Sequence, residues 1–196
     1  MYKIIGLQNI GDQYTDTPHS IGGQILKLIY KKNINIFSDI FFDKRKKAEI
    51  STAIIKNKNI EFIFPHTFMN LSGQVLNQEN LEKNLEKTII IHDDINLPFG
   101  KIKIVFNRND GGHNGVKNII QKLNSKKFIR IKIGVCPLDF LGKCKKPSKE
   151  YLNIYLTKKK IRKEYLKQYS DITIKVENII FEIIKTNYLN AMNKYN

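Results

Sequence analysis

The sequence predicts an α/β fold: a single globular domain with a twisted mixed, largely parallel β-sheet flanked by α-helices. Short apolar runs rich in Ile and Val alternate with segments whose apolar residues recur at helical spacing, the pattern of strands covered by helices. The chain has 196 residues, a length that suits one domain with its own core. We therefore expect residues 1–196 to form one domain.

Six strands and three helices carry this prediction. The strands are expected at residues 2–7, 48–56, 60–64, 88–92, 101–106 and 129–135. Helical spacing appears at Ile21, Ile25, Leu28 and Ile29, at Val116, Ile119, Ile120 and Leu123, and at Ile172, Val176, Ile179, Ile180, Ile183 and Ile184. These stripes predict the core-facing sides of helices.

The chain is strongly basic, with 34 Lys and Arg residues against 18 Asp and Glu residues and a formal net charge of +16. Such an excess is typical of proteins that bind a polyanion, and nucleic acid is the leading candidate. Lys, Asn and Ile are also over-used together, as in proteins from AT-rich genomes. The charge alone therefore leaves a compositional origin open.

Two isolated cysteines and the lack of an apparent signal peptide or membrane span predict a soluble cytoplasmic protein that does not bind a membrane. Cys136 and Cys144 have no neighbouring CxxC or clustered histidines, so neither a disulfide framework nor a zinc site is predicted. The start of the chain is too quickly polar for a signal peptide, and no run approaches the ~18 apolar residues of a membrane span.

Four polar segments interrupt the apolar pattern, each after a predicted strand. They are GLQNIGDQYTDTPHSIG (6–22), PHTFMNLSG (65–73), HDDINLPFG (92–100) and NRNDGGHNG (107–115). In open α/β sheets, ligands bind in the crevice beyond the carboxyl ends of the strands, so we expect these segments to converge there. Residues from about 136 to 163 contain Pro, Gly and the basic run 158–163, and we expect a loop and a basic helix over this cleft.

These segments carry a family resemblance. GLQNIGDQYTDTPHSIG resembles the N-terminal signature of bacterial peptidyl-tRNA hydrolases, usually GLGNPGxxYxxTRHNxG. FMNLSG, HDDINLPFG and GGHNG are similar to three further blocks of that family, in the same order and at near-family spacings, down to about residue 135. The resemblance implies an enzyme that hydrolyses the ester bond between a stranded peptide and its tRNA. It also implies a monomer with no cofactor, no metal and no obligatory protein partner, and tRNA as the bound partner.

His19 is the candidate general base. Thr17 and Pro18 predict a helix start, which would place the imidazole in the first turn, where the positive end of the helix disfavours imidazolium. A neutral histidine can take a proton from water. Asp93 is the candidate carboxylate that orients His19, and the resemblance places the family's histidine partner there. A capping histidine and a solvated acid are the alternative readings.

Three asparagines come from three different segments. The resemblance implies that Asn9 helps to tell blocked peptidyl-tRNA from free aminoacyl-tRNA. It also implies that Asn70 and Asn114 contact the tRNA terminus and organise water. Amide groups can both donate and accept hydrogen bonds, which suits a neutral ester.

Aromatic and basic residues complete the candidate site. Tyr14 and Phe68 match aromatic positions that the family uses around the 3′ end of tRNA, with core packing as the alternative for Phe68. Lys103 and Lys132, with Lys101 and Arg130 nearby, are candidate phosphate contacts. The family often has a second basic residue where this chain has Val105, and solvated lysines are the alternative reading.

Departures from the family pattern and two rival functions remain. Ile10, Pro18 and Ser20 replace the usual proline, arginine and asparagine of the first motif. One rival is a degenerate relative that binds RNA without hydrolysing it, as plant-organelle splicing relatives of the family do. The other is a metal-dependent phosphoesterase, for which the ligands would be His92, Asp93, Asp94 and His113. No GxSxG elbow is present for a serine triad.

Overall fold

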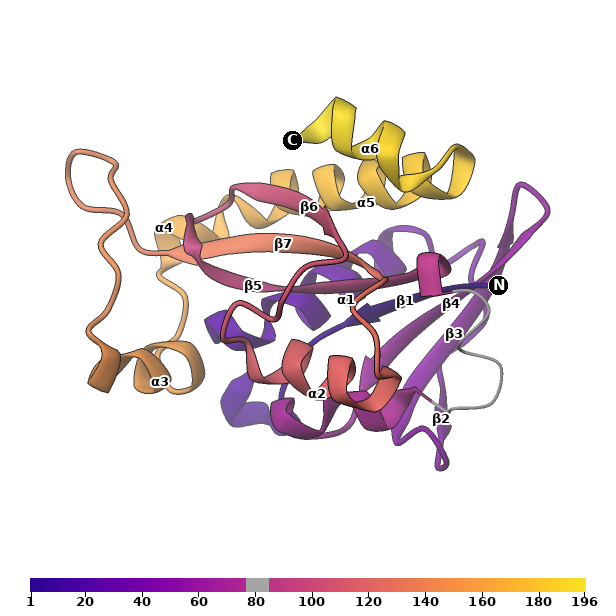
Figure 1. The fold of residues 1–196 in the computed structure, drawn as a ribbon, viewed down its shortest axis with the longest axis horizontal. Coiled ribbons are helices and arrows are strands. Elements are labelled where there is room, and N and C mark those ends of the chain that lie inside the picture. Colours follow the sequence, from indigo (N-terminus) through magenta and orange to yellow (C-terminus); the bar gives the residue numbers. More distant parts are fainter. Residues whose placement is uncertain (77–84) are drawn as a thin grey trace.

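One seven-stranded sheet, in the order β2-β3-β4-β1-β5-β7-β6, forms the centre of the molecule (Figure 1). The computed structural model describes residues 1–76 and 85–196. The strands are β1 (Tyr2–Gly6), β2 (Phe41–Asp43), β3 (Ala48–Ile55), β4 (Lys58–Pro65), β5 (Thr88–Pro98), β6 (Ile102–Phe106) and β7 (Ile129–Cys136). The α-helices are α1 (Ile21–Lys32), α2 (Asn114–Leu123), α3 (Lys149–Thr157), α4 (Lys163–Leu166), α5 (Tyr169–Lys185) and α6 (Tyr188–Tyr195). Short 3-10 turns are η1 (Asp12–Tyr14), η2 (Pro18–Ser20), η3 (Met69–Val75) and η4 (Leu85–Lys87).

The four central strands β4, β1, β5 and β7 run parallel, and antiparallel strands complete both edges of the sheet. The central strands are rich in Ile and other apolar residues, because both faces of this part of the sheet are covered. In β1, Ile4 packs into one core cluster and Ile5 into the other. The predicted α/β class with a mixed, largely parallel sheet is confirmed.

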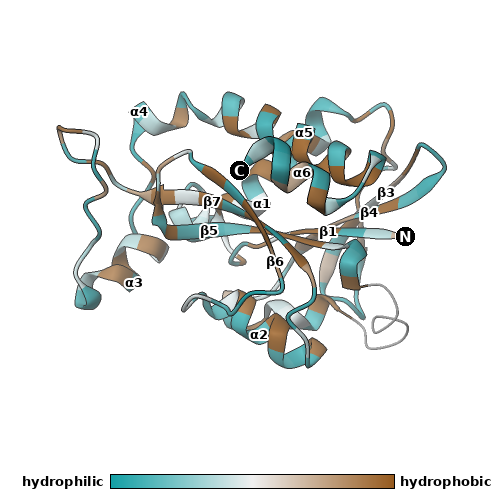
Figure 2. Cartoon of the chain, turned by 45° about the horizontal axis from the view of Figure 1, so that its top comes forward, coloured by the Kyte–Doolittle hydropathy of each residue, from teal (hydrophilic) through white to brown (hydrophobic). Residues whose placement is uncertain are grey.

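Helices cover the two faces of the sheet differently. α1, α5 and α6 pack on one face, and α2 with η3 packs on the other. Figure 1 shows α5 and α6 above the sheet and α2 below it. In Figure 2, hydrophobic and hydrophilic bands alternate along α5, whose predicted isoleucine stripe is buried. In the described part of the chain, no helix combines the length and hydrophobicity needed to cross a bilayer.

The strand predicted at 88–92 is longer than expected. β5 continues to Pro98, and Asp93 and Asp94 still pair with β7 before the register shifts between Asp94 and Pro98. The prediction ended the strand too early, because it was based on the run of apolar residues. The polar residues Asp93 and Asp94 still form backbone pairs with β7. The short edge strand β2 was not predicted.

The basic run 158–163 does not form the predicted helix. α3 ends before it, and α4 begins only at its last residue. Ile161 is buried and its N–H donates to the Asp16 carbonyl over 2.8 Å, while the Lys160 ammonium donates to carbonyls of the first polar loop. These hydrogen bonds connect residues 158–163 to the loop before His19.

Candidate active site

His19 lies in η2, the single turn that precedes α1, beside the polar end of β5. Gly22 explains this close approach, because a Cβ at that position would collide with the Ile91 carbonyl of β5. Two residues after Ile91, Asp93 Oδ1 accepts a hydrogen bond from His19 Nδ1 over 2.9 Å. The residues are 6% and 3% exposed, so the predicted partners meet in a buried contact.

This contact decides which ring nitrogen of His19 is free. Asp93 is an acceptor, so the proton sits on Nδ1 and Nε2 keeps a lone pair. Nε2 makes no hydrogen bond within residues 1–76 and 85–196 and is not among their buried unpartnered atoms. His19 lines a cleft of about 270 Å³, so the free nitrogen is available to a water molecule.

His113 is a second donor to Asp93, which the sequence did not predict. Its Nε2 donates to the same Oδ1 over 2.9 Å, and its ring lies 4.7 Å from that of His19. His113 Nδ1 accepts from the backbone N–H groups of Gly115 and Val116 as the N-cap of α2, which puts the ring proton on Nε2. The sequence offered His113 only as part of the GGHNG block and of the rival metal set, not as a partner of Asp93.

The two histidines and the carboxylate shift one another's acidity. Burial works against the Asp93 carboxylate, but His19 and His113, by charge and hydrogen bonding, hold its pKa well below the usual value. Burial also works against the His19 imidazolium, yet the charge and hydrogen bond of Asp93 outweigh it, so the pKa of His19 is raised. The lowering expected from a helix start is therefore outweighed: His19 lies in η2, before α1 begins at Ile21, and Asp93 is at hydrogen-bond distance.

His92 and Asp94 flank Asp93 but are engaged elsewhere. His92 Nδ1 donates to the Asp93 carbonyl over 2.7 Å, and burial, followed by the charges of His113 and Arg130, lowers the pKa of His92 well below its usual value. Asp94 pairs with Lys132 and accepts hydrogen bonds from Asn96.

The cleft beside His19 has a polar floor and an apolar wall. Asp93, Asp94, His113 and the glycines of NRNDGGHNG form one side. Ile95 with Leu152 and Leu156 of α3 forms the other, and Lys149 and Asn153 of α3 also line it. α3 therefore lies over the site, in the segment where the sequence predicts a covering element.

Asn9 and Tyr14 line a neighbouring pocket of about 290 Å³. Asn9 Oδ1 accepts from the Met69 N–H over 2.8 Å, which leaves the Asn9 amide NH2 to face other partners. The Asn9 N–H donates to the Ser20 hydroxyl over 3.3 Å. Ser20, a departure from the family pattern, thus still ties Asn9 to the turn that carries His19.

The remaining predicted contacts lie nearer the surface. Phe68 is 50% exposed and Asn70 is exposed; they flank Met69, whose N–H holds Asn9. Asn114 is exposed at the start of α2 and lines the cleft of His19. These side chains surround the site without joining the buried His19–Asp93–His113 cluster.

The candidate phosphate contacts differ in their surroundings. Lys103 on β6 is exposed and lies opposite Lys132 on β7, which lines the cleft and pairs with Asp94. Arg130 lies opposite Val105 but is 1% exposed, so its suggested contact with phosphate is wrong. Its face of β7 is covered there by the 107–113 loop.

His19, Asp93 and His113 also present three atoms of metal-ligand type within 4.8 Å of one another. The histidine nitrogens that face Asp93 both carry protons and donate to one carboxylate oxygen. They therefore have no lone pair to offer a metal ion between the three residues. In the rival metal set, His92 and Asp94 already have other partners. The donor set fits a hydrogen-bonded network.

Together, the mixed sheet and this edge define an α/β protein that holds a carboxylate-oriented histidine in an open cleft. Residues 3–196 match the family model described as peptidyl-tRNA hydrolase. The chain belongs to the peptidyl-tRNA hydrolase family.

Individual relatives agree with this assignment. The peptidyl-tRNA hydrolase of Clostridium botulinum strain 657 is 34% identical, covering 100% of this chain and 97% of the relative. That of Thermodesulfovibrio yellowstonii is 40% identical over 139 residues, 69% of this chain and 72% of the relative. The crystal structure of the Acinetobacter baumannii peptidyl-tRNA hydrolase has a TM-score of 0.85 at 22% identity and covers 100% of this chain and 94% of that chain. That likeness concerns the fold.

Proposed function

We propose that this protein hydrolyses the ester bond between a peptide and the 3′-terminal ribose of its tRNA, without a metal. Peptide and reusable tRNA would be the products, from peptidyl-tRNA dropped prematurely by ribosomes. One observation carries the proposal: His19 is held by Asp93 through Nδ1 and presents a free Nε2 to the cleft. We expect the protein to act as a monomer in the cytoplasm, in keeping with its family.

In the first step, His19 Nε2 removes a proton from a water molecule, and the oxygen attacks the ester carbonyl carbon. Asp93 stabilises the imidazolium that forms, and assistance of this kind is typically worth about 10²- to 10⁴-fold in rate. Because Asp93 raises the pKa of His19, the imidazole accepts the proton of water more readily than a free histidine does. His113 donates to the same Asp93 oxygen and helps to orient the carboxylate.

In the second step, the tetrahedral intermediate collapses. The His19 imidazolium returns its proton to the leaving ribose oxygen, and the base is regenerated. The oxyanion needs a donor, for which the exposed Asn70 amide or a backbone N–H is a candidate. One such donor is typically worth about 10²- to 10³-fold.

Asn9 suits the discrimination of blocked substrate. With its oxygen occupied by the Met69 N–H, it offers NH2 donors to a carbonyl oxygen. The amide carbonyl of an N-blocked aminoacyl group can accept this bond, whereas the ammonium of a free aminoacyl group has no acceptor. An unpaired donor facing an ammonium disfavours binding.

The tRNA end would then lie over the exposed groups around the cleft. Asn114 faces the cleft, and Tyr14 and Phe68 offer ring faces to a base or ribose. Lys103 and Lys132 lie opposite each other on β6 and β7, where both could contact one phosphate.

The test is release of N-acetyl-aminoacyl groups from tRNA by purified protein, with EDTA present and unblocked aminoacyl-tRNA as the control. Cleavage of the blocked substrate alone supports the proposal. Inactivation by EDTA would favour the metal-dependent rival. Absence of cleavage with retained tRNA binding would make the protein an RNA-binding relative that has lost hydrolysis.

A further inference from the structure

The loop 107–113 carries His113 from the far end of β7 back to the site. β6 runs antiparallel to β7 and ends opposite Ile129, whereas Asp93 lies beside Ile133. Four residues of strand span roughly 13 Å, so the chain has to return over that distance. A contact midway along the loop restricts where His113 arrives.

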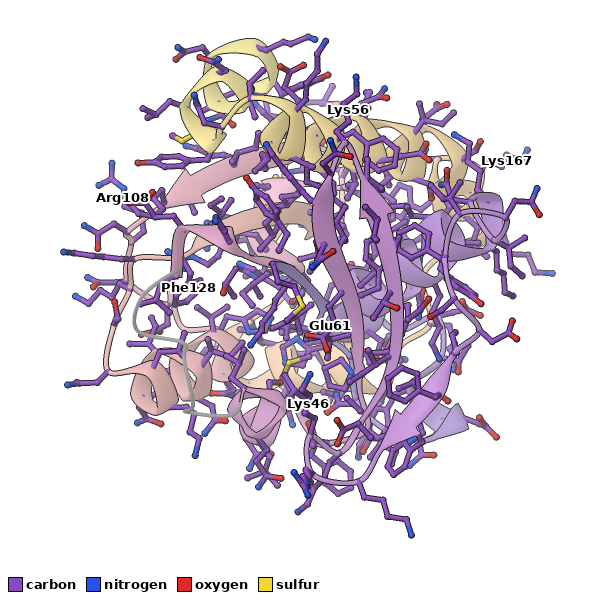
Figure 3. All side chains as sticks on the ribbon, turned by 90° about the vertical axis from the view of Figure 1, so that its right-hand side faces the viewer. Lys46, Lys56, Glu61, Arg108, Phe128 and Lys167 are labelled. Atoms are coloured by element: carbon purple, nitrogen blue, oxygen red, sulfur yellow. The ribbon has the colours of Figure 1, made fainter. Side chains whose placement is uncertain are left out.

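Arg130 supplies such a contact. Its Nη1 donates to the Asn109 carbonyl over 2.9 Å, and the residue is 1% exposed, with its guanidinium carbon 5.8 Å from the ring centre of Phe128. Phe128 is fully buried, whereas Arg108 of the 107–113 loop reaches outward at the edge of the molecule in Figure 3. Arg130 therefore contacts the loop from the interior of the protein.

The cost of burying Arg130 argues for a role beyond packing. Its Nε and Nη2 are buried and have no partner among residues 1–76 and 85–196. A buried guanidinium with unsatisfied donors is less favourable than an apolar side chain of similar volume. The charges of Asp110 and Asp94 offset part of this cost, because they oppose the lowering of the Arg130 pKa by burial.

We propose that Arg130 is a positioning residue: through the Asn109 carbonyl, its guanidinium holds His113 against Asp93. The catalytic value of this arrangement rests on the proposed function, in which His19 is the base. His113 donates to the oxygen that also accepts from His19, so its bond reduces the negative charge left to stabilise the His19 imidazolium. Arg130 thereby sets the pH at which His19 becomes a base.

Among the charged groups around His19 other than His113, Asp110 lies in the 107–113 loop and would move with it, whereas the rest belong to other elements. The titratable and charged groups that line the cleft with His19 are His92, Asp93, Asp94, Asp110, His113, Lys132 and Lys149. Asp94 and Lys132 pair with each other on β5 and β7, and Lys149 belongs to α3. Removing the charge of Arg130 would itself raise the His19 pKa, so the test has to preserve that charge.

The test follows the ring protons of His19 by NMR as pH is varied. Arg130→Lys keeps the positive charge, but its shorter side chain ends before Asn109. We expect the His19 midpoint to rise by about half a pH unit, as the charge-assisted bond of His113 to Asp93 weakens. Lys126→Met is the matched control: it removes the exposed hydrogen bond to Asn109 Oδ1 (2.7 Å) and should leave the midpoint unchanged.

An unshifted His19 in Arg130→Lys overturns the proposal. Should that variant not fold, a glycine inserted between Asn109 and Asp110 provides the same test with the buried arginine intact, and the same upward shift is expected. In a His113→Ala background, Arg130→Lys should cause no further shift, and a shift that persists there contradicts a role through His113.

This titration needs no substrate. An inactive wild-type protein would refute the proposed function and leave the role of Arg130 still testable. In the active protein, the acidic limb of the kcat/KM profile should move by the same amount as the NMR midpoint.

Discussion

The inner and outer parts of the site differ in how their side chains are held. In the inner part, Asp93 accepts hydrogen bonds from His19 and His113, and all three residues are buried. In the outer part, Asn70 and Asn114 are exposed. The groups proposed to exchange protons are therefore fixed by the folded protein itself, whereas the groups proposed to recognise tRNA are exposed to solvent.

Fixing the inner part has an energetic reason. A carboxylate shifts the pKa of a histidine strongly only in a buried site at hydrogen-bond distance, since water screens the same pair at the surface. Recognition of a long polyanion has the opposite requirement, because many weak contacts have to form at once. If this comparison is right, substitutions in the two parts should differ in size and in kind.

The largest effect is expected for His19→Ala. Without the base, kcat should fall about 10²- to 10⁴-fold, because water has to be activated without a proton acceptor. Binding of tRNA should stay near the wild-type value, which a filter-binding assay with uncharged tRNA measures. Full activity in this variant would eliminate the proposed mechanism.

Asp93→Asn should lower activity and also move its pH dependence. The raised pKa of His19 comes from Asp93, so loss of the carboxylate charge should shift the acidic limb of kcat to lower pH. Activity then falls at the plateau, because the amide no longer stabilises the imidazolium. A pH–rate profile measures both changes, with Asp171→Asn, an exposed acid on α5, as the control. An unmoved limb would mean that Asp93 does not tune His19.

Smaller effects are expected in the outer part. Asn114→Ala should reduce kcat/KM by up to about 10-fold, since one hydrogen bond typically contributes about 1 kcal/mol. A loss of the same size in Asn70→Ala would mean that a backbone N–H, and not the Asn70 amide, is the oxyanion donor. The position of the acidic limb should not move. Steady-state kinetics on N-acetyl-aminoacyl-tRNA test this, with exposed Asn59→Ala on β4 as the control. A shifted limb would mean that the two parts of the site are coupled.

The same contrast explains what the sequence could predict. The pairing of His19 with Asp93 and the α/β class followed from motifs and apolar periodicity, which are local signals. The contact of His113 with Asp93 depends on the return path of a loop, for which no local pattern exists. Arg130 and Lys132 lie two residues apart on β7 and therefore on the same face of the strand. The 107–113 loop nevertheless covers Arg130, whereas Lys132 lines the cleft. Only the assembled fold separates these two residues.

The smallest effect is expected for Lys103→Ala. One phosphate contact in an exposed position should contribute a few-fold to tRNA affinity, and its loss should reduce the slope of log Kd against log salt by about 1. Lys56→Ala is the matched control, because this exposed lysine lies at the turn between β3 and β4 (Figure 3). If both variants lower the slope equally, the charge of +16 acts as a diffuse field and not through a defined contact. If only Lys103→Ala does, the pair Lys103 and Lys132 marks where the tRNA backbone crosses the sheet.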